Sequence, residues 1–178
     1  MKNILVISTS LRENSNSEML GDAFIEGAKA ANHHVEKITL KHKTISFCQG
    51  CLACQKTQKC SLHDDANEIV EKMKKADVLV FVTPIYYYEM SGQLKTLLDR
   101  ANPLYGSNYT FRQIYMLTSA AEDEEFVPKR AIAGLTGWID CFEKAKLVDT
   151  VFAGGVNDAG DITGHPSLEK AYKLGKGI

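Results

Sequence analysis

Two hydrophobic patterns alternate along the chain, and each is typical of one kind of secondary structure. Short runs of β-branched and other apolar residues are typical of strands buried on both faces. Such runs predict five strands, at residues 4–7, 35–40, 78–82, 114–117 and 148–152. Apolar residues that recur every three or four positions predict helices at 19–31, 64–73, 91–100, 129–144 and from 166 onward. Strands that alternate with helices in this way indicate a parallel sheet with helices on both faces.

The size and composition fit a single α/β domain over residues 1–178. Hydrophobic residues make up 44% of the chain and charged residues 24%, as in ordinary globular proteins. The formal net charge of −1 argues against a nucleic-acid binder, which usually carries a strongly basic face. We expect no signal peptide and no membrane segment, since no apolar stretch approaches the ~20 residues that cross a bilayer. The expected location is therefore cytoplasmic, where thiols stay reduced.

The loop after the first predicted strand is rich in short polar side chains. A phosphate at a helix N-terminus is bound by backbone N–H groups, hydroxyl donors and the helix dipole. One such side chain would be explained as a helix N-cap, but a run of them with an arginine favours a phosphate site. The candidate ligands are Ser8, Ser10, Arg12, Ser15, Asn16 and Ser17. The loop matches neither G-x-x-x-x-G-K-[ST] nor G-x-G-x-x-G, so no triphosphate or dinucleotide loop is implied.

The loop after the third predicted strand, residues 83–92, contains three successive tyrosines that cannot all face a core. Its proline stiffens the backbone, and its aromatic and apolar side chains suit the face or edge of a ring system. The candidate ring contacts are Pro84, Ile85, Tyr86 and Tyr87. A tyrosine-rich dimer interface is the alternative, and the two interpretations are compatible because paired subunits can close a cofactor cleft.

Four of the five cysteines follow one another with the spacing C-x2-C-x2-C-x5-C, within a segment at 44–63 that we expect to be irregular. These are Cys48, Cys51, Cys54 and Cys60. Three interpretations stay open: a [4Fe–4S] cluster, free or oxidisable thiols, and zinc, although zinc sites more often consist of two separated C-x2-C pairs. The fifth cysteine, Cys141, falls in a helical pattern, and we expect it to be buried as a small apolar residue.

Together these segments resemble the flavodoxin-like NAD(P)H-dependent FMN reductases, and in particular their iron–sulfur flavoprotein branch. Residues 9–17 are similar to the phosphate loop G-S-P-R-x-x-G-N-T of that family, from which Thr9, Leu11 and Ser15 depart. Residues 83–87 are similar to the flavin loop T-P-[VI]-Y-[WFY]. The compact spacing of the four cysteines is similar to the cluster pattern of the branch.

The resemblance implies a fold and a set of cofactors. The fold is a five-stranded parallel sheet of order 2-1-3-4-5, in a homodimer or a dimer of dimers. FMN would be held through its phosphate by Ser10, Arg12, Asn16 and Ser17. Because Ser119 ends the fourth predicted strand at the carboxyl edge of the sheet, we expect it to bond the flavin ring. The four cysteines would hold a [4Fe–4S] cluster. We expect the segment that contains them, residues 48–60, here called the cysteine window, to lie beside the flavin.

The resemblance also implies a redox function. We expect an FMN-dependent NAD(P)H oxidoreductase that passes electrons to a quinone, a flavin, an azo compound or a partner protein. No catalytic side chain is expected, because the flavin carries the chemistry. The alternative is a non-enzymatic iron–sulfur electron carrier or a thiol redox sensor.

Overall fold

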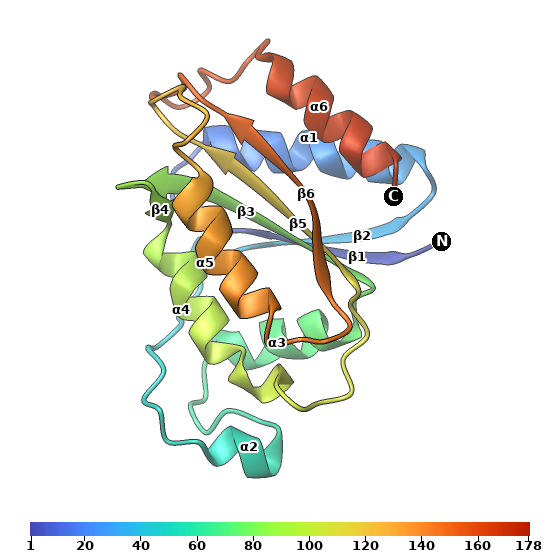
Figure 1. The fold of residues 1–178 in the computed structure, drawn as a ribbon, viewed down its shortest axis with the longest axis vertical. Helices are drawn as coiled ribbons and strands as arrows, with labels where there is room; N and C mark the ends of the chain where they lie inside the picture. The colour runs from blue at the N-terminus through green and yellow to red at the C-terminus, as the bar shows by residue number, and fades with distance from the viewer.

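The computed structural model describes all residues, 1–178, and consists of one central sheet between two layers of helices (Figure 1). The strands are β1 (Asn3–Ser8), β2 (His34–Thr39), β3 (Val78–Tyr86), β4 (Glu89–Met90), β5 (Gln113–Ser119) and β6 (Lys146–Ala153). Five of them are parallel in the order β2-β1-β3-β5-β6, and β4 pairs antiparallel with β3. Counted among the parallel strands alone, this order is 2-1-3-4-5, which confirms the predicted flavodoxin-like topology.

The helices cover both faces of the sheet (Figure 1). One layer contains α1 (Asn16–Ala30) and α6 (Pro166–Lys176). The other layer contains α3 (Asp65–Lys75), α4 (Gly92–Arg100) and α5 (Lys129–Ile139), while α2 (Ala53–Thr57) and the 3₁₀ helix η1 (Asn102–Leu104) lie in connections. In β1, Leu5 and Ile7 enter one hydrophobic core, and Ile4 and Val6 enter the other. Burial on both faces explains why the strands are continuous apolar runs rather than alternating ones.

The chain after α5 differs from the sequence prediction. The predicted helix at 129–144 ends at Ile139, and the following residues form turns in which the Phe142 N–H donates to the Ile139 carbonyl at 2.8 Å. These turns bury Phe142 against Trp138, with ring centroids 4.5 Å apart. The prediction that Cys141 is buried is wrong, because the same turns leave its side chain exposed.

The carboxyl ends of the central strands lie at one edge of the sheet. Ser8 at the end of β1 is in register with Val82 of β3, and Pro84 of β3 is in register with Ser119 at the end of β5. The loops that follow these strands therefore leave the sheet side by side, as in other open α/β sheets that bind ligands at this edge. None of the helices combines the length and apolar character that a membrane span requires.

Candidate functional site

A cavity of about 190 Å³ lies at the carboxyl edge of the sheet, between the end of β3 and the loops after β1, β5 and β6. Its wall contains eight of the eleven residues predicted to bind the cofactor: Ser10, Arg12, Ser15, Asn16, Pro84, Ile85, Tyr86 and Ser119. The remaining wall residues are Ala120, Ala121, Val156 and Asn157. The fold thus brings the two predicted loops together, while the role of each side chain stays a prediction.

The other three predicted residues lie away from the cavity wall. Ser8 is buried in the sheet, and its hydroxyl has no hydrogen-bond partner. Ser17 is buried in the first turn of α1, where its hydroxyl pairs with that of Ser15 at 2.9 Å. Tyr87 is 97% exposed at the tip of the β3–β4 hairpin. Ser8 and Ser17 are therefore buried in the elements that flank the loop, and Tyr87 lies in solvent outside the cavity.

The polar loop ends in a capped helix N-terminus. Ser15 is the N-cap of α1, and its hydroxyl accepts a hydrogen bond from the backbone N–H of Glu18 at 3.4 Å. The first backbone N–H groups of this 15-residue helix have no partner within the helix, and the macrodipole adds positive character there. This end of the cavity therefore suits an anionic group.

Two side chains of this loop tie it to the segment after β6, a link that sequence reasoning missed. Arg12 Nη1 donates to the Asn157 carbonyl at 2.6 Å, and Asn16 Nδ2 donates to the Asp158 carbonyl at 2.8 Å. Asn16 Oδ1 also accepts from the backbone N–H groups of Gly160 and Ile162, at 3.1 and 3.2 Å. The partners lie more than 140 residues away, so no local signal in the sequence could reveal these contacts.

The tyrosine segment forms a tight hairpin. Tyr86 of β3 pairs with Glu89 of β4, which leaves Tyr87 and Tyr88 as a two-residue turn with φ angles of 51° and 66°. Such left-handed angles are strained for bulky side chains, and Asn or Gly normally supplies them. The Tyr88 hydroxyl donates to Glu122 Oε1 at 3.2 Å, and its ring stacks on Phe126 with centroids 5.9 Å apart.

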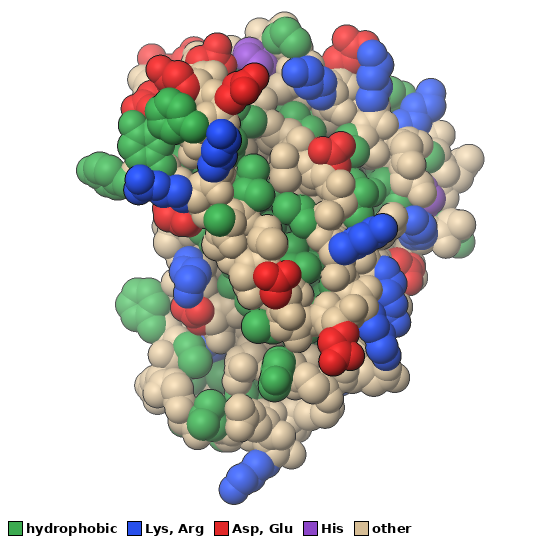
Figure 2. Space-filling model, in the orientation of Figure 1, with side chains coloured by type: hydrophobic (Ala, Val, Ile, Leu, Met, Phe, Trp, Pro, Cys, Tyr) green, Lys and Arg blue, Asp and Glu red, His purple; other side chains and the backbone are tan.

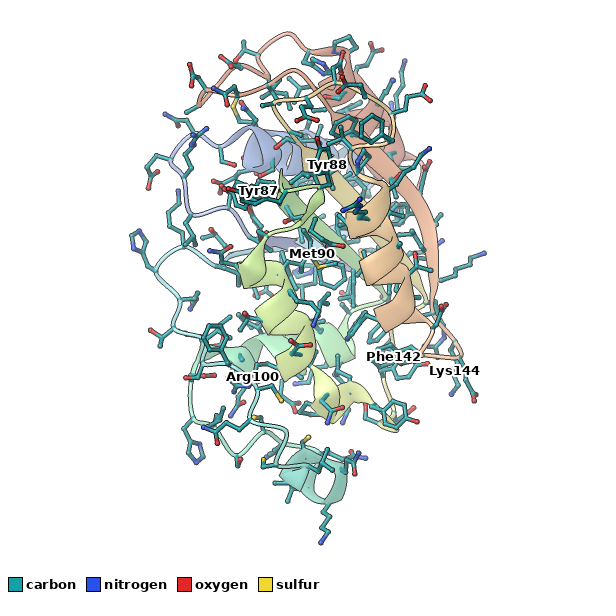
Figure 3. The ribbon with its side chains drawn as sticks, turned by 60° about the vertical axis from the view of Figure 1, so that its left-hand side comes forward. Tyr87, Tyr88, Met90, Arg100, Phe142 and Lys144 are labelled. Atoms are coloured by element: carbon teal, nitrogen blue, oxygen red, sulfur yellow. The ribbon has the colours of Figure 1, made fainter.

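The two tyrosines of the turn point in different directions. Tyr88 is directed towards the segment before α5, whereas Tyr87 extends outward (Figure 3). The hydrogen bond to Glu122 raises the pKa of Tyr88, as does the charge of that carboxylate. Tyr88 thus fixes the hairpin against the loop after β5, and Tyr86 remains on the cavity wall.

The chemistry of the wall fits FMN. Arg12 is the only charged side chain on it, and it lies at the same end as the helix N-terminus and the hydroxyls of Ser10 and Ser15. Pro84, Ile85 and Tyr86 add an apolar and aromatic surface to the wall. The polar residues would hold a phosphate, and the apolar and aromatic residues would contact a flavin ring.

A second cavity, of about 490 Å³, has all five cysteines on its wall: Cys48, Cys51, Cys54, Cys60 and Cys141. The two cavities share no wall residue. On the wall of the first cavity, Tyr86 pairs with Glu89, two residues before the N-cap of α4. The wall of the second cavity contains Arg100, the last residue of the same helix. Within one chain, the cysteine window therefore lies apart from the cavity at the carboxyl edge of the sheet, where we predict the flavin. The reason is that the segment after β2 runs away from the sheet edge before it reaches the cysteines (Figure 1).

The thiols share this cavity without forming a ready metal site. All five are free, and no three His, Cys, Asp or Glu side chains lie close enough together to hold a metal ion. Cys54 Sγ accepts a hydrogen bond from Asn102 Nδ2 at 3.0 Å. The contact of Cys51 with the Ser61 hydroxyl, at 3.5 Å, lowers the pKa of the Cys51 thiol. In kind, the four thiols on one cavity wall suit a thiolate-bound cluster, but they would have to converge further to bind one.

Comparison with known proteins agrees with the class that the fold and cavities define, a flavodoxin-like FMN protein. The NADPH-dependent FMN reductase family matches residues 2–125. The chain therefore belongs to this family.

Individual relatives include proteins named for two kinds of redox group. An iron–sulfur flavoprotein of Archaeoglobus fulgidus is 27% identical over 184 residues, which span all of this chain and 79% of that protein. An iron–sulfur flavoprotein of Methanocaldococcus jannaschii is 36% identical over 101 residues, which span 57% of this chain but only 52% of that protein. Among solved structures, an azoreductase of Bacillus anthracis aligns over the full length of both chains with a TM-score of 0.75 and 19% identity. At that identity the similarity shows the fold alone.

Proposed function

We propose that this protein is an FMN-dependent NAD(P)H oxidoreductase, which takes electrons from a nicotinamide and passes them to a small acceptor or a partner protein. The observation that supports this most directly is the cavity at the carboxyl edge of the sheet. It joins an anion-binding helix terminus with Arg12 to an aromatic wall that includes Tyr86. Membership of the NADPH-dependent FMN reductase family supports the same assignment.

The residues of the chain bind and orient, and the cofactor reacts. When bound, FMN supplies the acceptor for a hydride from the nicotinamide. Arg12, Ser10 and the helix N-terminus capped by Ser15 would hold its phosphate. Pro84, Ile85 and Tyr86 would support the flavin ring and exclude water from one side. Ser119, whose side chain is buried at the end of β5, would offer a hydroxyl at the ring edge.

We also propose that Cys48, Cys51, Cys54 and Cys60 hold a [4Fe–4S] cluster. Two observations support this assignment: the four thiols share the wall of one cavity, and several relatives are named iron–sulfur flavoproteins. The assembly we propose is a homodimer. Hydrophobic side chains gather over the β3–β4 hairpin (Figure 2). Tyr87 of this hairpin is almost fully exposed, and Phe126, which stacks on Tyr88, is half-exposed. Exposed aromatic side chains are enriched in subunit contacts.

The test begins with protein purified without oxygen. We expect a yellow protein that oxidises NADH or NADPH when a quinone, an azo dye or free flavin is present. In the Arg12→Gln variant, we expect the Kd for FMN to rise by about ten- to a hundredfold, because a charge-assisted phosphate contact is lost. Lys29→Gln, a change of an exposed residue near the other end of α1, is the control and should leave the Kd unchanged.

Two results would contradict the proposal. Failure to bind FMN would exclude the assignment of the cavity. Binding of FMN without oxidation of either nicotinamide, together with reduction by a ferredoxin, would instead favour an electron carrier.

A further inference from the structure

A buried ion pair lies under the cysteine window. Arg100, the last residue of α4, has no exposed side-chain surface, and the Asp64 side chain is only 7% exposed. Arg100 Nη1 and Nη2 donate to the two carboxylate oxygens of Asp64, at 2.6 and 2.9 Å. This two-point geometry is the strongest form of such a pair and fixes the orientation of the guanidinium.

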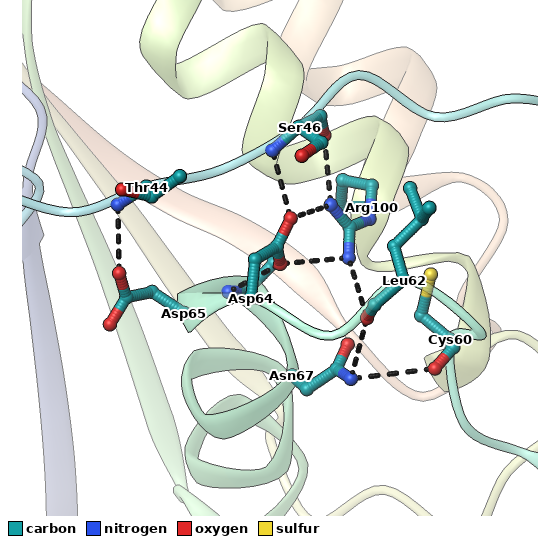
Figure 4. A network of polar contacts seen from close by, with 9 residues as sticks. Thr44, Ser46, Cys60, Leu62, Asp64, Asp65, Asn67 and Arg100 are labelled. Carbon is teal, nitrogen blue, oxygen red and sulfur yellow. Dashed lines mark hydrogen bonds and ion pairs between the residues drawn. The ribbon is translucent and has the colours of Figure 1, made fainter.

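The same guanidinium holds both ends of the window (Figure 4). Nη1 donates to the carbonyl of Ser46, two residues before Cys48, at 2.8 Å. Nη2 donates to the carbonyl of Leu62, two residues after Cys60, at 3.4 Å. Asp64 completes the closure by accepting from the backbone N–H of Ser46 at 2.9 Å. The two ends of the window are therefore joined through one buried arginine.

One hydrogen-bond donor of the Arg100 side chain is unpaired. Its Nε–H is buried and has no hydrogen-bond partner, although such groups are rarely left unpaired in folded proteins. Arg100 and Cys60 both lie on the wall of the thiol cavity, and Cys60 lies on the opposite side of the guanidinium from Asp64 in Figure 4.

We propose that Arg100 is a positioning residue for the cysteine window, with two roles. Its Nη groups hold the two ends of the window together, and its Nε–H donates to the sulfur of Cys60 once that sulfur is a cluster ligand. The second part rests on the proposed cluster, and the first does not. A hydrogen bond to a ligand sulfur favours the more negative, reduced state of a cluster and raises its reduction potential. Asn102 already makes such a contact with Cys54 in this structure.

The first role, in which Arg100 holds the two ends of the window together, is tested by trypsin digestion of the metal-free, FMN-loaded protein. The window contains two exposed cleavage sites, Lys56 and Lys59. In Arg100→Lys and in Asp64→Asn, we expect cleavage there at least about tenfold faster than in the unmodified protein, because local opening of the window becomes easier. Arg112→Lys is the matched control, since Arg112 is exposed and bonds only to carbonyls of its own segment. Equal cleavage rates in the unmodified protein and the three variants would overturn this first role of Arg100.

The Nε–H contact is tested on protein reconstituted with iron and sulfide, by a redox titration followed by visible absorption. We expect a more negative potential in Arg100→Lys, which lacks the Nε donor. Asp64→Asn keeps that donor, so its potential should be unchanged or more positive. If Arg100 had a purely structural role, both variants would bind less iron, but their reduction potentials would not differ in this way. Equal potentials, or an unmodified protein that takes up no iron, would overturn the contact. FMN content, measured in each sample, reports separately on the proposed function.

Discussion

The charge of Asp64 offers a quantitative test of how the cysteine window is held. Its carboxylate accepts four hydrogen bonds, two from Arg100 and one each from the backbone N–H groups of Ser46 and Ala66. Burial raises the pKa of Asp64, but these hydrogen bonds and the charge of Arg100 outweigh burial and lower it from 3.8 to about 2. The folded state therefore binds the ionised carboxylate more favourably than the unfolded state does.

The shift sets both the size and the pH range of the effect. A fall from 3.8 to about 2, at about 1.4 kcal/mol for each pKa unit, corresponds to about 2.5 kcal/mol of folding free energy. Because the folded pKa is the lower one, this stabilisation is fully present well above pH 3.8 and is lost as the pH falls towards 2. Asp64→Asn removes it at every pH and leaves Arg100 buried without a counter-charge, so we expect a loss of about 3 kcal/mol at pH 7.

Urea unfolding of both proteins at pH 7, 5, 4 and 3 measures this difference. We expect the gap in unfolding free energy between the unmodified protein and Asp64→Asn to narrow progressively below pH 4. The control is Asp99→Asn on α4, whose carboxylate is half-exposed and pairs with Lys95 at 2.7 Å. Such an exposed pair contributes at most about 0.5 kcal/mol. A gap that is the same at pH 7 and pH 3, or an equal loss in Asp99→Asn, would refute the reasoning.

Four other substitutions test the helix packing and the β3–β4 hairpin. A Cβ at Gly27 would overlap the backbone carbonyl of Tyr172 where α1 and α6 touch, so Gly27→Ala should cost at least about 1–3 kcal/mol in urea unfolding. Gly137→Ala, in open space on α5, should instead stabilise by about 0.5–1 kcal/mol, and the same sign in both would contradict the close approach. Tyr87→Asn should raise the melting temperature by relieving a left-handed backbone, whereas Tyr88→Asn should lower it by removing the Phe126 stack.

Most of the fold could be predicted from local patterns in the sequence. The buried strands are continuous apolar runs, and the loops that follow β1 and β3 carry their chemistry within ten residues, so both could be recognised. The end of α5 could not, because Leu135, Ile139 and Phe142 keep a helical spacing whether the chain continues as a helix or turns. What decides is the aromatic packing of Phe142, which involves residues from other elements.

Long-range polar contacts were also beyond sequence reasoning. Asp64 and Arg100 are 36 residues apart, and each on its own is typical of a charged residue at the end of a helix. The position of the cysteine window relative to the flavin cavity depends on the path of the segment after β2, which no pattern specifies. The family resemblance supplied the cofactors but not this geometry.

Helix α4 connects the two cavities of the molecule. At its N-terminus the Ser91 hydroxyl lies 3.0 Å from that of Thr9, and the Ser91 N–H donates to the hydroxyl of Thr83 at 3.1 Å. These contacts anchor α4 to the loop after β1 and to β3, which border the proposed flavin cavity. Arg100 anchors the other end of α4 to the cysteine window. A nine-residue helix spans about 13 Å. Because both ends are fixed by buried polar contacts, the distance between the two proposed redox groups within one chain is set by a rigid helix rather than by the loops that carry their ligands.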